Sequence, residues 1–150
     1  MNEGEQLVAR LPRMKWLGGK TLDFLFEPDG SIVEVKFSNP HGIASGSDGN
    51  YVCQFKWVRI DPRNFNWLIL TAKDERNRWR LWLLPAKKVR GFLTTAKNDT
   101  ISYTLDAVRK RWHTARFDEF GLTYEELHPL CLGGSLATPR PSLLHTTRNL

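Results

Sequence analysis

The segment that decides the fold reads Thr21-Leu22-Asp23-Phe24-Leu25-Phe26-Glu27-Pro28-Asp29-Gly30-Ser31-Ile32-Val33-Glu34-Val35-Lys36-Phe37. An Asp-Gly dipeptide between two apolar runs is the strongest short-range signal for a β-hairpin. With that dipeptide as a two-residue loop, Leu25 pairs with Glu34 and Asp23 with Lys36. Because strand side chains alternate between faces, positions 22, 24, 26, 33, 35 and 37 form an apolar core face. The sequence therefore predicts a hairpin whose other face gathers Asp23, Glu34 and Lys36.

The face on which Asp23 lies depends on the length of the loop. A three-residue loop would shift the pairing by one residue and move Asp23 to the core face. The apolar alternation favours the two-residue loop, because that shift would also split the core face. Two carboxylates and an ammonium on a rigid hairpin are then typical of a divalent-metal site with a cation beside it. The alternative is an ordinary ion-pair set on a solvent-facing sheet surface.

Length and composition indicate one globular domain. Of the 150 residues, 41% are hydrophobic and 25% are charged, which is ordinary for such a domain. No apolar run approaches the ~18 residues of a membrane span, and the acidic N-terminus lacks the apolar stretch of a signal peptide. We therefore expect a cytoplasmic protein with no membrane partner. Its two cysteines, Cys53 and Cys131, are expected to be free buried thiols.

The charge of the chain is concentrated in its middle. The net charge is +6, and residues 56–112 contain 14 Lys and Arg against 5 Asp and Glu. The remainder of the chain is therefore net negative. A basic middle of this kind is the electrostatic footprint of a polyanion ligand, most often a nucleic acid. The alternative is a solvated basic surface without a ligand.

The remaining segments predict a mixed arrangement of helices and strands. A short amphipathic helix is expected over 3–15, a loop over 38–50, an extended segment or helix start over 51–60, buried strands over 66–71 and 79–84, and helices over 104–113 and from the capping box at Thr123 onward. These elements predict an α/β fold with a central mixed β-sheet flanked by helices. We assign residues 1–132 to a single domain and 133–150 to a flexible or loosely packed tail.

The spacing Asp23-(x10)-Glu34-Val35-Lys36 resembles the signature of the PD-(D/E)XK nuclease superfamily, which has the restriction-endonuclease-like fold. As in that family, the Asp lies on the first strand of a hairpin and the acidic-x-Lys motif on the second. A Gln-bearing segment and two buried strands follow, as in many such enzymes. The residue before Asp23 is Leu22, where the family signature has Pro. The resemblance implies a restriction-endonuclease-like core and a metal-dependent endodeoxyribonuclease that hydrolyses phosphodiester bonds.

The resemblance also assigns roles to individual residues. Asp23 and Glu34 would bind Mg²⁺, for which Mn²⁺ can substitute, together with the carbonyl of Val35 and a glutamate from the N-terminal helix. Glu5 is the best match for that glutamate, and Glu3 is the next. Lys36 would orient or deprotonate the attacking water, or stabilise the pentavalent phosphorus. Gln54 has three interpretations. It is a hydrogen-bonding group beside the site, an ordinary surface amide, or part of a shifted catalytic motif, Gln54-x-Lys56, in which Glu34 replaces the metal-binding Asp.

Basic residues near turns and after the last buried strand are the expected contacts to DNA phosphates. They are Lys56, Arg59, Arg63, Arg76, Arg78, Lys87, Lys88 and Arg90. A chain of this size has little room for a separate specificity domain, so cutting both strands would require a homodimer or higher oligomer. Restriction, homing or junction-resolving activity would suit it. The alternatives are a non-catalytic basic nucleic-acid-binding module and an RNA-cleaving or toxin nuclease on the same core.

Overall fold

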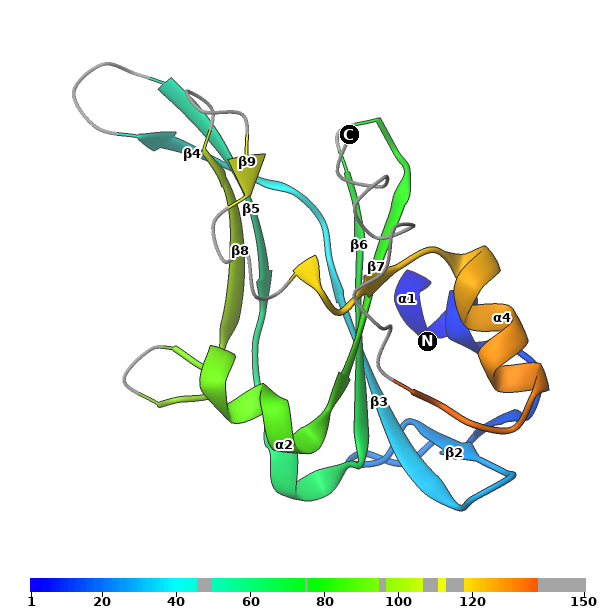
Figure 1. The fold of residues 1–150 in the computed structure, drawn as a ribbon. Helices are drawn as coiled ribbons and strands as arrows, with labels where there is room; N and C mark the ends of the chain where they lie inside the picture. Colours follow the sequence, from blue (N-terminus) through cyan, green and yellow to red (C-terminus); the bar gives the residue numbers. More distant parts are fainter. Residues whose placement is uncertain (46–49, 75, 95–96, 107–110, 113–117, 138–150) are drawn as a thin grey trace.

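The computed structural model describes the chain except for residues 46–49, 75, 95–96, 107–110, 113–117 and 138–150. It contains two β-sheets and a few short helices (Figure 1). In chain order the elements are α1 (Glu3–Ala9), β1 (Met14–Trp16), β2 (Phe24–Phe26), β3 (Ser31–Ser38), β4 (His41–Ser45), β5 (Asn50–Trp57), η1 (Pro62–Asn64), β6 (Trp67–Lys73), β7 (Trp79–Pro85), α2 (Ala86–Val89), η2 (Arg90–Phe92), β8 (Ile101–Asp106), β9 (Arg111–Trp112), β10 (Gly121–Leu122) and α4 (Tyr124–Leu132). The protein therefore belongs to the mixed α and β class that the sequence predicts.

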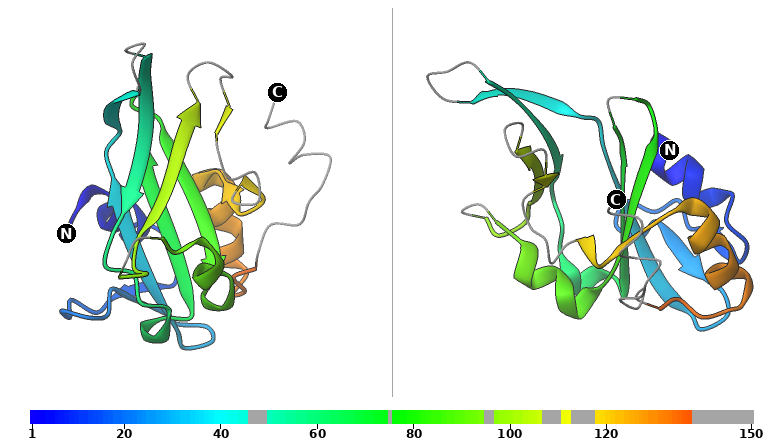
Figure 2. Two further views of the ribbon diagram at one scale, coloured as in Figure 1. Left: turned by 90° about the vertical axis from the view of Figure 1, so that its left-hand side faces the viewer. Right: turned by 45° about the horizontal axis from the view of Figure 1, so that its top comes forward.

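The larger sheet has six strands in the order β1-β2-β3-β6-β7-β10. Strands β3 and β6 are parallel and the other neighbours are antiparallel, so the sheet is mixed as predicted. Helices α1 and α4 pack on one face through Val8 and Leu127. A second sheet, in the order β4-β5-β8-β9, lies over the other face (Figure 1, Figure 2). Helices thus flank one face of the mixed sheet, and strands cover the other.

Each interface between layers has its own apolar core. The first lies between the six-stranded sheet and the helices and includes Phe24. The second lies between the two sheets, where the rings of Trp57 and Trp82 have centroids 5.4 Å apart. Strand β6 serves both cores, because Ile69 points into the first and Leu68 into the second. A strand buried on both faces needs a continuous apolar run, which explains the composition of this segment.

The hairpin forms with a longer loop than predicted. Phe26 pairs with Ser31, so the four residues 27–30 connect β2 and β3. The predicted pairing of Asp23 with Lys36 is therefore wrong by two positions. The reason is Pro28, which has no N–H and cannot complete a ladder pair with Ser31. Because the shift is even, the residues of β3 keep their predicted faces.

A bend in the chain joins the two sheets. Strand β3 ends at Ser38, and β4 begins at His41 in the other sheet. The Ser38 side chain is buried; its hydroxyl donates to the carbonyl of Asn39 (2.9 Å) and accepts the Lys56 backbone N–H (3.0 Å). These two bonds fix β5 against the end of β3. Strands that pass between packed sheets commonly make such corners.

Three other predictions are corrected by the structure. The expected helix over 104–113 is wrong, since β8 and β9 occupy its described part. Burial of Ile101 and Tyr103 alternates with half-exposed Ser102, and this period of two identifies a strand. The expected loop over 38–50 is wrong in its described part, because β4 lies within it. Leu22, expected on the core face, precedes β2 and is 36% exposed.

Several local predictions are confirmed. Segment 51–60 takes the extended alternative as β5, and the two buried strands form as β6 and β7. The Thr123 hydroxyl accepts the Glu126 N–H and the Glu126 side chain accepts the Thr123 N–H, so the capping box opens α4. The N-terminal helix also forms, but the expected span of 3–15 is too long: α1 ends at Ala9, before Pro12, and β1 begins at Met14.

The segment after α4 returns to the protein over its first few residues. Leu136 is buried in the first core, and the remainder from 138 onward lies outside the described residues. Cys131 is a free buried thiol, as expected. In the described part of the chain, no helix is both long and apolar enough to cross a membrane.

Candidate active site

The predicted carboxylates meet where β2 and β3 separate. Asp23 directly precedes β2, and its Oδ2 accepts a hydrogen bond from the Val35 backbone N–H at 2.9 Å. Val35 lies between Glu34 and Lys36 on β3. The hydrogen bond therefore holds the Asp23 carboxylate beside the acidic-x-Lys motif.

The backbone geometry also places the Val35 carbonyl on the Asp23 side. Thr71 on β6 donates its hydroxyl hydrogen to the Lys36 carbonyl at 2.8 Å, so that carbonyl faces β6. Neighbouring residues of a strand point their N–H and C=O groups to opposite sides, and each residue points both groups the same way. The Val35 carbonyl accordingly faces away from β6, in the direction of its own N–H and of Asp23.

Glu34 and Lys36 lie on the face of the six-stranded sheet that looks toward the second sheet. They are in register with Leu68 and Leu70, which belong to the core between the sheets. The Lys36 Nζ lies 3.5 Å from Glu34 Oε1, with side chains 24% and 16% exposed respectively. This partial burial strengthens the electrostatic interactions among the charged groups.

The fourth predicted residue, Glu5, reaches the same group from α1. Burial is the main cause that raises the pKa of Asp23, and the charge of Glu5 and a hydrogen bond with its side chain raise it further. The Val35 N–H and the charge of Lys36 act in the opposite direction on that pKa. The charges of Glu5 and Lys36 thus both act on the Asp23 carboxylate.

The acidity of Glu34 shows the same competition. Burial raises the pKa of Glu34, and the charges of Asp23 and Asp61 add to that rise, whereas Lys36 lowers it through its charge and a hydrogen bond. The site holds more negative than positive charge when its carboxyls are ionised. Such an arrangement favours binding of a cation.

These donors are chemically suited to Mg²⁺. In the described part of the chain, no three or more His, Cys, Asp or Glu side chains are close enough together to hold a metal ion. Magnesium commonly uses only one or two protein carboxylates and keeps several waters. The carboxylates of Asp23 and Glu34 with the Val35 carbonyl meet that requirement, and Glu5 lies beside them.

Gln54 and Lys56 lie apart from this cluster. Gln54 is opposite His41 in the second sheet, and its Nε2 donates to the Thr104 hydroxyl at 3.2 Å. Lys56 is exposed, and its backbone N–H is bound to Ser38. Phe55 and Trp57 of the same strand belong to the core between the sheets, so Gln54 and Lys56 lie on the opposite face of β5. The structure therefore brings together Glu34-x-Lys36 with Asp23, and does not bring Gln54-x-Lys56 into the same group.

One set of predicted phosphate-binding residues surrounds η1. Asp61 holds Arg63 through two short contacts, Nε to Oδ1 at 3.0 Å and Nη2 to Oδ2 at 2.8 Å. The Arg63 side chain and backbone N–H lower the pKa of Asp61 to about 2. Arg59 is exposed and adopts a positive φ of 58°. Because the charge of Asp61 raises the pKa of Glu34, this set lies within electrostatic reach of the candidate site.

The other predicted cations lie at two further places. Arg76 and Arg78 lie in the turn between β6 and β7, where the Asp74 carboxylate accepts hydrogen bonds from both of their backbone N–H groups and from the Arg78 Nε. Lys87 and Lys88 are exposed on α2, and Arg90 is exposed at the start of η2. The expected phosphate contacts thus form several groups.

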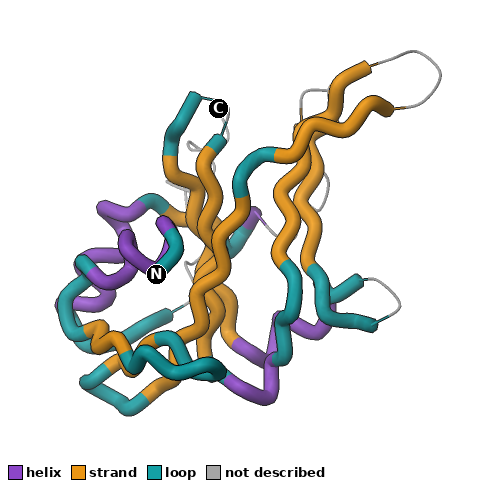
Figure 3. The backbone as a smooth tube through the Cα atoms, turned by 180° about the vertical axis from the view of Figure 1, so that it is seen from behind, coloured by secondary structure: helices purple, strands orange, loops and turns teal. Residues whose placement is uncertain are grey.

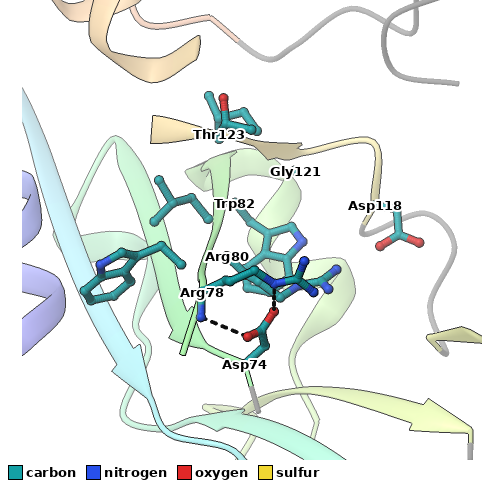
Figure 4. A pocket seen from close by; sticks show the side chains of 10 residues that line it. Asp74, Arg78, Arg80, Trp82, Asp118, Gly121 and Thr123 are labelled. Atoms are coloured by element: carbon teal, nitrogen blue, oxygen red, sulfur yellow. Dashed lines mark hydrogen bonds and ion pairs between the residues drawn. The ribbon is translucent and has the colours of Figure 1, made fainter. Parts of the chain in front are cut away.

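A pocket that the sequence did not indicate lies at the β7–β10 edge of the larger sheet (Figure 4). Its volume is about 370 Å³, and its lining includes Arg78, Arg80 and Thr123. Asp74 and Asp118 also line it, so it contains as many carboxylates as guanidinium groups. Asp74 is bound to Arg78, and Asp118 accepts a hydrogen bond from the Tyr103 hydroxyl. None of the predicted metal ligands lines this pocket.

Sequence reasoning missed the residues that support the site. Thr71 fixes the Lys36 carbonyl, and Gly4 lets α1 approach the sheet, since a Cβ there would lie 2.1 Å from the Thr71 Oγ1. Trp57 is buried and donates its indole N–H to the Thr71 carbonyl. A local pattern cannot reveal these contacts, because they join distant elements.

Comparison with family models, with curated proteins and with solved structures gives no match to this chain. The functional argument therefore depends on the site itself.

Proposed function

We propose that this protein is a Mg²⁺-dependent DNA endonuclease with a PD-(D/E)XK site on a restriction-endonuclease-like core. The observation that carries the proposal is the hydrogen bond from the Val35 N–H to Asp23. It places one carboxylate beside a second carboxylate and a lysine in the order that the motif requires. The mixed sheet on which these residues lie is compatible with such a core.

The roles of the residues follow from their surroundings. Asp23, Glu34 and the Val35 carbonyl would hold the metal ion, and Glu5 adds negative charge beside them. A bound Mg²⁺ supplies a more acidic water and neutralises charge on the phosphate. Lys36 carries a positive charge next to Glu34, so its ammonium can bind a phosphate oxygen or orient the attacking water. Partial burial of these side chains limits competition from bulk water.

Substrate binding would depend on the basic middle of the chain. Arg63 is held in a defined orientation by Asp61 near the site, which suits contact with a phosphate close to the one cleaved. The exposed cations of α2 and η2 would contact the backbone farther along. Contacts of this kind fix the register of the DNA and are independent of its sequence.

Metal-dependent cleavage tests the proposal. Supercoiled plasmid and a branched DNA are incubated with the protein in Mg²⁺, Mn²⁺ or EDTA. We expect nicked or linear products in either metal and none in EDTA. Cleavage that persists in EDTA, or no cleavage of any DNA including a random-sequence pool, would contradict a metal-dependent nuclease.

One observation favours a second candidate, a non-catalytic nucleic-acid-binding module. The ion pair between Lys36 and Glu34 satisfies both charges without a metal. In such a module Glu34→Gln would leave every DNA-related property unchanged. Charge reversal at Lys87, Lys88 and Arg90 would weaken binding, and the dependence of affinity on salt would fall.

A further inference from the structure

The edges of the two sheets differ in how they are protected. In the described part of the chain, the sheets end at β1, β10, β4 and β9. Strands β9 and β10 have two residues each, and β1 has three, including Lys15. Short strands and charged residues are the usual means of preventing pairing with another chain. Strand β4 has five residues, His41-Gly42-Ile43-Ala44-Ser45, and contains no Lys, Arg, Asp, Glu or Pro.

Strand β4 is also accessible as an edge. It pairs with β5 alone, and the two strands extend past the end of the larger sheet as a ribbon (Figure 3). A two-stranded ribbon is at best marginally stable in water. Because β4 is the edge strand of its sheet, its backbone groups that face away from β5 have no strand partner within that sheet. A strand added at this edge would supply one.

The charge of the ribbon distinguishes between possible partners. Residues 39–55 contain a single charged residue, Asp48, although the chain has 22 Lys and Arg in 150 residues. DNA is held mainly by cations that contact its phosphates, and this segment has none. Two copies of a +6 protein repel each other, so a surface for self-association is favoured where charge is lowest. Both considerations favour a second copy of the chain over DNA.

We propose that β4 pairs antiparallel with β4 of a second copy. A two-fold axis would relate the two copies. Two identical edge strands can pair antiparallel across such an axis without any other complementary surface. The two four-stranded sheets would become one continuous sheet. A contact of this limited area is expected to be weak, with a dissociation constant on the order of micromolar.

This pairing would connect the two active sites. Only two residues, Asn39 and Pro40, separate β3 from β4, and the Ser38 hydrogen bonds fix the corner. Each copy would therefore hold its Glu34-x-Lys36 strand rigidly with respect to the axis. This consequence depends on the proposed nuclease function, whereas the pairing itself does not.

The test is sedimentation equilibrium of the full chain without metal or DNA, so that its outcome is independent of cleavage. Concentrations span about 1 to 100 µM, around the expected dissociation constant. Ile43→Lys places a charge at the edge, and Val58→Lys is the matched control, because Val58 is 44% exposed and lies outside the ribbon. We expect a monomer–dimer equilibrium for the wild type and Val58→Lys, and a loss of affinity of at least tenfold for Ile43→Lys.

Hydrogen exchange keeps the test decisive if Ile43→Lys folds poorly. Amides of residues 41–45 in the wild type should gain protection as concentration rises, while amides of β6 should not change. A wild type that remains monomeric at the highest concentration overturns the proposal. Protection of β4 only after DNA is added also overturns it, because DNA would then be the partner.

Discussion

The Asp23 carboxylate accepts the Val35 backbone N–H at 2.9 Å, although the two residues do not belong to the same strand pair. This bond replaces the ladder contact that β2 would make if it continued along β3. At the point where β2 and β3 separate, the Asp23 carboxylate takes the place of a backbone carbonyl as the acceptor. Glu34 and Lys36 lie on either side of Val35, which donates the hydrogen bond. The fold thereby gathers three charged groups at the point where the two strands separate.

Two substitutions of Asp23 separate its charge from its hydrogen bond. Asp23→Asn keeps an oxygen that accepts the Val35 N–H but removes the negative charge. We expect a stability at pH 7 at least equal to that of the wild type, because the raised pKa of Asp23 means that its charge is unfavourable in the folded state, and a loss of Mg²⁺-dependent cleavage of at least a hundredfold. Asp23→Ala removes both, and leaving a partly buried N–H unpaired costs ~1–3 kcal/mol. Urea unfolding and plasmid cleavage, measured on both variants, check the pair. Equal destabilisation by Asp23→Asn and Asp23→Ala would contradict a stabilising role of the hydrogen bond to Val35.

The raised pKa values of Asp23 and Glu34 predict how stability depends on pH. The pKa values of both carboxyls are raised in the folded state. Such a carboxyl binds more protons when the protein is folded than when it is unfolded, so the free energy of unfolding decreases as pH rises from the unfolded-state pKa through the folded-state pKa. Removing one ionisable group removes part of this effect. We therefore expect Glu34→Gln to raise the Tm at pH 7 relative to wild type, and to reduce the loss of stability above about pH 4.

The control for that experiment is Glu27→Gln, since Glu27 is exposed in the hairpin loop. Its Tm should match wild type at every pH. Added Mg²⁺ should raise the Tm of the wild type and leave that of Glu34→Gln nearly unchanged. A decrease in Tm for Glu34→Gln at pH 7 would show that the ion pair with Lys36 outweighs the cost of burying the charge.

Gly4 is expected to be required for both stability and activity. A Cβ at this position would lie 2.1 Å from the Thr71 Oγ1 and 3.1 Å from the Phe37 Cβ, so Gly4→Ala must displace α1 or turn the Thr71 hydroxyl away from the Lys36 carbonyl. Overpacking of this kind costs ~1–3 kcal/mol, and the shift would move Glu5 away from Asp23. Gly91→Ala is the matched control, because a Cβ there meets nothing within 4 Å. Calorimetry should show a lower Tm for Gly4→Ala alone.

The corner at Ser38 provides a test of the connection between the sheets. Ser38→Ala would leave the partly buried Lys56 N–H without its acceptor, at a cost of ~1–3 kcal/mol. Ser135→Ala, at an exposed position after α4, should change the free energy of unfolding by less than about 0.5 kcal/mol. Similar free energies of unfolding for Ser38→Ala and Ser135→Ala would contradict the proposal that the Ser38 hydrogen bonds hold β5 against the end of β3.

The parts of the fold that depend on local pattern were predictable. The Asp-Gly turn, the apolar run of β6 and the capping box at Thr123 are local signals, and all form elements. The loop is longer than the Asp-Gly signal predicts, because Pro28 has no N–H to complete a ladder pair with Ser31. The helix expected over 104–113 is wrong, because packing between the two sheets buries alternate residues of β8, Ile101 and Tyr103, as in a strand.

The candidate site shows the same division. The even register shift kept Glu34 and Lys36 on one face, so the predicted grouping with Asp23 survives in the structure. The supporting contacts of Gly4 and Thr71 were not predictable, since they bring α1, β3 and β6 together through tertiary packing. The position of Gln54 likewise required knowledge that β5 belongs to a second sheet.

The most direct test compares Lys36→Ala with Lys56→Ala in plasmid cleavage with Mg²⁺ and in DNA binding with EDTA. Lys36→Ala removes the lysine of the Glu34-x-Lys36 motif, and Lys56→Ala removes the lysine of the Gln54-x-Lys56 motif. Both variants lose one positive charge, so each is a control for the effect of charge in the other. We expect Lys36→Ala to abolish cleavage and to bind DNA nearly as well as wild type, and Lys56→Ala to cleave at least a tenth as fast as wild type. Full cleavage by Lys36→Ala, with or without loss in Lys56→Ala, would contradict the assignment of the active site to Asp23, Glu34 and Lys36.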